Sequence, residues 1–141
     1  MYKSILLPVE IGHGGSWEKS LPVALDLAEK CGAKLHLVTN VPDVGMSIVS
    51  SYLPSDFEAR ALQKAADELD AFAEANVPAD VRGESHVAHG VTRREIVNTA
   101  DKLGCDLIIM SPHRPEMMDL VISPNTATVV ERAKCSVLVV R

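Results

Sequence analysis

The sequence predicts an α/β fold, a single doubly wound five-stranded parallel sheet with helices on both faces, similar to the Rossmann arrangement. Short apolar runs alternate with segments whose apolar residues recur at helical spacing, in the order βαβαβαβαβ. Several runs consist almost entirely of Ile, Leu and Val, which is typical of strands covered on both faces. The 141 residues contain no linker or repeat, so residues 1–141 are expected to form one domain.

The expected strands differ in how apolar they are. "YKSILLPV", "CDLIIM" and "SVLVVR" are apolar almost throughout, whereas "DVRGESHVA" is mostly polar and is expected at an edge of the sheet. The five expected strands are residues 2–9, 34–41, 80–88, 105–110 and 136–141.

The expected helices carry start and stop signals. Gly32 and Gly104 are expected to end two of them, and Ser123 followed by Pro124 is a strong start signal for the last. The four expected helices are residues 17–31, 55–76, 92–103 and 124–133.

Three further helix starts are predicted from hydroxyl residues. "SDFE" and "TRRE" have the pattern of a capping box, with Ser55 and Thr92 as N-caps. Ser16 is the expected N-cap of the first helix, and Trp17 is expected to pack that helix against the sheet.

Composition narrows the class of partner. The net charge is −5 and no basic face stands out, so nucleic acid is not an expected partner. The apolar start is too short for a signal peptide and no stretch could span a bilayer, so a cytoplasmic protein without membrane contact is expected. Cys31, Cys105 and Cys135 lack CxxC spacing and are expected to be free thiols.

Ligands of doubly wound sheets bind at the carboxyl ends of the strands, where the strand order reverses. The loops at that edge are expected to begin at Glu10, Val41, Ala88 and Ser111. The loop 42–54 is long and nearly uncharged, and long loops are more often functional than idle.

Four segments of the chain resemble the universal stress protein family. They are "ILLPVE", "KLHLVTNVP", "DLIIMSPHRP" and "NTATVVERAKCSVLVVR", so the resemblance covers the whole chain. "HRP", followed by an acidic residue, an apolar stretch and an Asn, is similar to the short F/G-type subgroup. The resemblance implies a stress-response regulatory protein, acting as a homodimer, that binds an adenine nucleotide such as ATP or AMP.

The resemblance also implies where a nucleotide would lie. Its nucleoside end would lie at the ends of the first two strands and its phosphates at the loop and helix after the fourth. The implied nucleotide-binding residues are Pro8, Val9, Glu10, Asn40, Val41, Ser111, His113, Arg114, Ser123, Asn125 and Thr126. Each carboxylate, Arg and His among them has an ordinary alternative, such as a solvated strand-end carboxylate for Glu10.

The phosphate loop departs from the family pattern G-x2-G-x9-G-(S/T), because every glycine is missing. Pro112, Pro115 and Pro124 instead fix φ near −65° and remove N–H donors. Arg114 and His113 offer replacement donors, or are a solvated Arg and a turn His. Two functions therefore stay open: a nucleotide-binding regulator, or a dimeric interaction module of the same family that binds no nucleotide.

The stretch "EIGHGGSWEKS" offers a second possible anion cradle between a strand and a helix. The pattern is weak, because GxGG without a Lys or a matched acidic residue is often only a turn.

Catalysis finds little support in the sequence. His86 and His89 are three apart on a strand, which places them on opposite faces, and HExxH, a nucleophile elbow and a Walker loop are absent. We expect no resident metal beyond Mg²⁺ brought by a nucleotide, and at most slow ATP hydrolysis.

The last expected strand predicts dimerisation. If "SVLVVR" is an edge, its unpaired backbone groups are free to pair with another chain. Family members often pair these strands about a two-fold axis, which implies an interface at Val137, Leu138, Val139 and Val140. The alternative is that the charges of Arg141 and the terminal carboxylate oppose such pairing.

Overall fold

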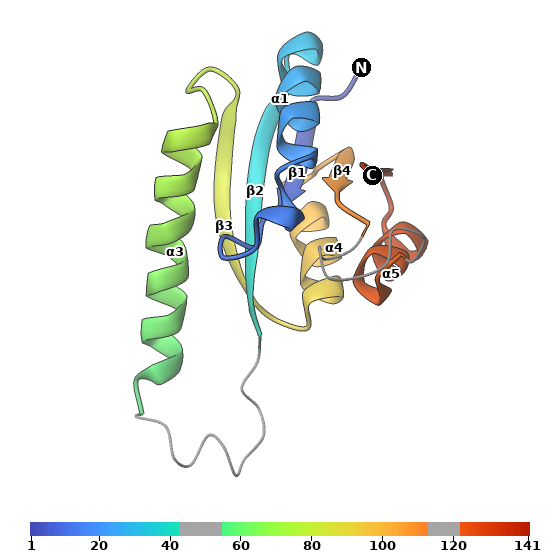
Figure 1. Ribbon diagram of the computed structural model, residues 1–141. Coiled ribbons are helices and arrows are strands. Elements are labelled where there is room, and N and C mark those ends of the chain that lie inside the picture. Colours follow the sequence, from blue (N-terminus) through green and yellow to red (C-terminus); the bar gives the residue numbers. More distant parts are fainter. Residues whose placement is uncertain (43–54, 113–121) are drawn as a thin grey trace.

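The computed structural model describes residues 1–42, 55–112 and 122–141, and it confirms the predicted fold class. Five parallel strands form one sheet in the order β3-β2-β1-β4-β5 (Figure 1). The strands are β1 (Ser4–Pro8), β2 (Lys34–Pro42), β3 (Arg82–Gly90), β4 (Leu107–Met110) and β5 (Ser136–Val139). As predicted, the polar strand β3 lies at an edge, and β5 forms the other edge.

Two layers of helices cover the sheet. The helices are α1 (Ser20–Cys31), α3 (Phe57–Asn76), α4 (Thr92–Leu103) and α5 (Pro124–Arg132), with a short 3₁₀ helix η1 (Gly14–Ser16) before α1. Helices α1 and α3 pack on one face, whereas α4 and α5 pack on the other (Figure 1). None of the helices in the described ranges is long and apolar enough to cross a membrane.

The nearly continuous apolar runs follow from this two-sided covering. In β1, Ile5 and Leu7 face the core under α1 and α3, while Leu6 between them faces the core under α4 and α5. All three side chains are fully buried. Alternate residues of a strand point to opposite faces, so a strand buried on both faces needs apolar residues at consecutive positions.

Trp17 packs into the larger core as predicted. Its ring meets Phe72 of α3 edge to face, with 5.0 Å between ring centroids. This contact joins the segment before α1 to the neighbouring helix on the same face of the sheet.

The glycine and proline signals at the helix ends are confirmed. Gly32 and Gly104 are left-handed C-caps with φ of 65° and 66°. Ser123 is the N-cap of α5, where its hydroxyl accepts from the Thr126 N–H at 3.2 Å, and Pro124 is the first helical residue.

The three other predicted caps are wrong, because tertiary contacts use their hydroxyls or a neighbour takes the position. α4 has Val91 at its N-cap, and the Thr92 hydroxyl instead accepts from Asn40. α3 has Asp56 at its N-cap, and the Asp56 carboxylate pairs with Arg60 at 2.7 Å. The remaining predicted cap, Ser16, lies in η1 and bonds to the backbone of the preceding turn.

The chain changes direction across the sheet at β1. It passes from β1 to β2 and β3 on one side, then crosses to β4 and β5 on the other. The switch point therefore lies between β1 and β4, and a crevice is expected at their carboxyl ends.

Candidate functional site

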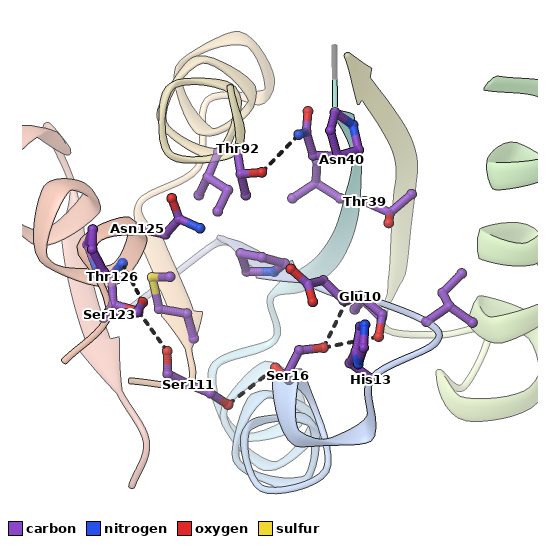
Figure 2. Close-up of a pocket in the computed structure, with 18 residues that line it drawn as sticks. Glu10, His13, Ser16, Thr39, Asn40, Thr92, Ser111, Ser123, Asn125 and Thr126 are labelled. Carbon is purple, nitrogen blue, oxygen red and sulfur yellow. Dashed lines mark hydrogen bonds between the residues drawn. The ribbon is translucent and has the colours of Figure 1, made fainter. Parts of the chain in front are cut away.

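A cavity of about 520 Å³ opens at this switch point (Figure 2). Its walls come from the carboxyl ends of β1, β2 and β4, the loop after β1, and the first turns of α4 and α5. Its position agrees with the expectation drawn from the order of the elements, and its volume suits a nucleotide-sized ligand.

Most of the predicted binding residues meet in this cavity. Eight of them line it: Pro8, Val9, Glu10, Asn40, Ser111, Ser123, Asn125 and Thr126. Val41 does not line it, although its neighbours Asn40 and Pro42 do. His113 and Arg114 lie outside the described residues.

The loop after β1 folds back on the hydroxyl of Ser16. Ser16 Oγ accepts from the Glu10 N–H at 2.9 Å and lies 3.2 Å from the Glu10 carbonyl, to which it donates. The His13 N–H donates to the same carbonyl at 2.9 Å. These bonds fix the half-buried Glu10 at the cavity wall, and the glycine-rich stretch after it forms the turn of η1.

A chain of hydrogen bonds connects this loop to α5 across the floor of the site (Figure 2). Ser111 Oγ donates to the Ser16 carbonyl at 3.2 Å, and the Ser111 carbonyl accepts from Thr126 Oγ1 at 2.9 Å. Ser123 Oγ lies 3.1 Å from Thr126 Oγ1 and donates to it, because the Thr126 proton is already used. Four residues from three segments are thereby held in one arrangement.

The first turn of α5 faces the cavity with few free donors. Pro124 has no N–H, and the Ser123 hydroxyl occupies that of Thr126. Only the N–H of Asn125 remains in this turn before the first intrahelical bond, which runs from Ala127 to the Ser123 carbonyl. The helix end is positive but offers an anion one backbone donor and the Asn125 amide.

Asn40 has a structural task that sequence reasoning did not predict. Its Nδ2 donates to the Gly90 carbonyl and to Thr92 Oγ1, both at 3.0 Å, and so attaches the end of β2 to the start of α4. Its Oδ1 is buried and accepts no hydrogen bond from the residues that the structure describes. The side chain thus attaches β2 to α4 at the cavity wall.

Sequence reasoning missed several lining residues. They are Ile11, His13, Ser16, Val38, Thr39, Pro42, Thr92, Ile96 and Met110. Val38 and Met110 of the smaller core could have been found from strand alternation, since they face the side of the sheet that α4 covers, and Ile96 is one of the buried residues of α4 itself. The position of Ser16 follows from its bonds to Glu10, for which the sequence carries no signal.

The described residues include no group of three or more His, Cys, Asp or Glu placed to hold a metal ion. The two histidines of β3 lie on opposite faces, as predicted. His89 Nδ1 is 3.2 Å from Glu58 of α3, whereas His86 lies on the α4 side, where burial and the nearby Lys102 lower its pKa.

The fold and the cavity define a class: a doubly wound α/β fold with a cleft at its switch point. The profile of the Universal stress protein family matches residues 1–141, and the chain belongs to that family. A curated relative, Universal stress protein G of Shigella flexneri, is 27% identical over 144 residues and is aligned over 100% of both chains.

Solved structures share the fold. Universal stress protein UspA from Lactobacillus plantarum superposes with a TM-score of 0.71 at 22% identity, covering 99% of this chain and 98% of that one. A universal stress protein from Archaeoglobus fulgidus in complex with dAMP has a TM-score of 0.63 at 15% identity over 99% and 98%. A universal stress protein in complex with cAMP gives 0.61 at 20% over 99% and 97%.

Proposed function

We propose that this chain is a cytoplasmic stress-response regulatory protein that binds an adenine nucleotide in the switch-point cavity and acts as a homodimer. One observation carries the proposal: eight of the implied nucleotide-binding residues line a single cavity of about 520 Å³. The complexes of two relatives with cAMP and dAMP support adenine nucleotides as the ligand class. The free thiols of the chain support a reducing compartment.

The walls suggest how a nucleotide would lie. Val38, Ile96 and Met110 offer apolar surface for the base. Glu10 lines the cavity and would accept from a ribose hydroxyl, and the first turn of α5 with Asn125 would face the phosphate end. The sequence carries no catalytic motif, so we propose regulation by occupancy, with at most slow ATP turnover and Mg²⁺ only as a companion of the nucleotide.

The small number of hydrogen-bond donors for phosphate predicts how the affinities of AMP and ATP compare. With one free backbone N–H and the Asn125 amide at the start of α5, this turn can hold the α-phosphate but offers few donors to β- and γ-phosphates. We therefore expect AMP and ATP to bind with affinities within about tenfold of each other, which corresponds to about 1.4 kcal/mol.

Calorimetric titration of the purified protein with adenosine, AMP, ATP and GMP tests the proposal. We expect saturable heat with AMP and ATP, and loss of affinity in Glu10→Ala with little change in Glu18→Ala. Glu18 matches the charge change but does not line the cavity. Absence of heat with every nucleotide at millimolar concentration, together with no ligand released from the pure protein in mass spectrometry, contradicts it.

A second candidate is the dimeric interaction module that binds no nucleotide. Pro124 and the cap at Ser123 favour it, because they remove two of the N–H groups that an anion would use. In that case the titration gives no heat while the protein still dimerises, so the same samples separate the two candidates.

The proposed dimer interface is the free edge of β5. On its inner side β5 pairs with β4, and no strand within the described residues pairs with its outer side. Leu138 is 36% exposed, and Val137, Val139 and Val140 are half-buried. Pairing with a second copy would satisfy the edge backbone and cover these side chains.

A further inference from the structure

A second concavity lies away from the nucleotide cavity, between α4 and α5. It has a volume of about 220 Å³ and is lined by Arg93, Arg94, Val97, Asn98, Thr128 and Arg132. We call it the arginine groove. It shares no lining residue with the larger cavity, although both lie along the same two helices.

The charge of the groove is unusual for this chain. The net charge is −5, yet three guanidinium groups line one groove. Several other exposed cations have acidic partners, such as Arg60 with Asp56 at 2.7 Å and Lys30 with Asp26 at 2.8 Å, although Lys3 and Lys19 have none among the described residues. Over residues 1–42, 55–112 and 122–141, none of the three groove arginines forms an ion pair.

Two of the arginines occupy positions that helix electrostatics disfavours. Arg93 and Arg94 lie in the first turn of α4, where the helix dipole is positive and acidic residues are preferred. The single acidic residue of that turn is Glu95, which lies beside Gly90. Residues that oppose the helix dipole in this way are found mainly at functional sites, so Arg93 and Arg94 indicate a binding site here.

The arrangement of the positive charge indicates the kind of ligand. Neighbouring residues of a helix point about 100° apart around its axis. The extended side chains of Arg93 and Arg94 therefore do not converge on a single small ligand. Arg132 stands on the opposite wall, in the last turn of α5. Charge spread along two walls suits several carboxylates on an extended segment better than a single phosphate.

We propose that the arginine groove docks an acidic peptide segment of a partner protein. The guanidinium groups pair with Asp or Glu side chains, while the amide of Asn98 and the hydroxyl of Thr128 bond to the peptide backbone. Nucleic acid is disfavoured, because three arginines in a chain of net charge −5 provide too small a basic footprint.

Fluorescence anisotropy with a labelled peptide of alternating Asp and Ser residues tests this docking. We expect saturable binding that weakens with salt, and no binding of the same peptide with Asn in place of Asp. The double variant Arg93→Ala/Arg132→Ala is expected to lose about tenfold or more in affinity. The control Arg60→Ala/Lys64→Ala on α3 changes the net charge equally and is expected to stay within about twofold.

Four outcomes overturn the proposal. Equal losses in both double variants indicate general charge attraction, and an unchanged affinity in the groove variant removes the groove from binding. Displacement by inorganic phosphate beyond that by chloride at matched ionic strength assigns the groove to phosphate. Light scattering that reveals a salt-sensitive assembly dissolved by the peptide assigns it to a second copy. Circular dichroism of each variant verifies that the fold is retained.

Discussion

The hydroxyl of Thr126 donates to the carbonyl of Ser111 at 2.9 Å, which joins the end of β4 to the first turn of α5. A second bond, from the Ser123 N–H to the Pro112 carbonyl at 2.7 Å, joins the same two ends. The connection between β4 and α5 is therefore closed at its base. This closure fixes the helix N-terminus against the switch point without using the glycines that the family pattern places in this connection.

Replacement of Thr126 by Val tests this closure. Thr126 is 1% exposed, and the change removes its hydroxyl while keeping its shape, so the Ser111 carbonyl loses its partner inside the protein. We expect the free energy of unfolding to fall by about 1–3 kcal/mol in urea denaturation. Thr128→Val, on the half-buried side of the same helix, is the control and is expected to change stability by less than about 0.5 kcal/mol.

The sequence predicts the sheet well, because a strand that is buried on both faces has apolar residues at consecutive positions. Ile5, Leu6 and Leu7 form a continuous apolar run only because helices cover both sides of β1. The helix ends at Gly32 and Gly104 are also predicted from the sequence, because both glycines adopt the positive φ that other residues rarely adopt. Apolar runs and glycines at helix ends can both be recognised from a few neighbouring residues of the sequence.

The site was predicted less completely, because tertiary contacts reassign its polar groups. The Thr92 hydroxyl was expected to cap its helix but accepts from Asn40, a residue 52 positions away. Ser16 likewise binds the Glu10 backbone instead of capping a helix. A hydroxyl can satisfy either partner, and only the folded chain decides between them.

Glycine at the end of α4 makes a measurable contribution. Gly104 has φ of 66°, and a Cβ there would meet no atom within 4 Å, so the cost of Gly104→Ala is conformational. We expect a loss of about 1–2 kcal/mol in the free energy of unfolding. Gly12→Ala also places its Cβ in open space but requires no positive φ, and it is expected to be neutral or slightly stabilising. Equal losses in both variants contradict the argument.

Stability is expected to fall in mild acid because of His36. Its Nδ1 accepts from the Glu84 N–H at 2.8 Å, which requires an unprotonated nitrogen. Burial lowers the pKa of His36 below its usual 6.5, against an opposing effect of Glu84, and burial with Lys102 lowers the pKa of His86. The unfolded chain then binds more protons than the folded one at and below pH 6.5, so stability present above that pH is lost as the pH falls.

Urea denaturation at about pH 7.5 and about pH 5.5 measures this loss. His36→Gln is expected to reduce the difference between the two conditions, and His36→Gln/His86→Gln to reduce it further. A pH difference that is unchanged in the double variant assigns the loss to other groups.

The free edge of β5 predicts a variant that separates assembly from folding. Leu138→Lys places a charge in the proposed interface, whereas Phe57→Lys changes a residue of similar exposure, 39% against 36%, at the start of α3. We expect light scattering to show a dimer for the parent protein and Phe57→Lys, and the 15.2 kDa monomer for Leu138→Lys. A monomeric parent protein removes the proposed interface.

The first turn of α5 allows nucleotide binding to be separated from helix stability. Asn125→Asp adds a negative charge to this turn, which has no acidic residue of its own, so the helix dipole should stabilise the fold by about 0.3–1 kcal/mol. The same charge repels a bound phosphate, so we expect calorimetry to give an AMP affinity about tenfold weaker and an adenosine affinity unchanged. Weakening of both ligands indicates that the variant disturbs the cavity as a whole. Unchanged AMP binding in a stabilised variant means that the phosphate does not lie at α5, even if the nucleoside end occupies the cavity.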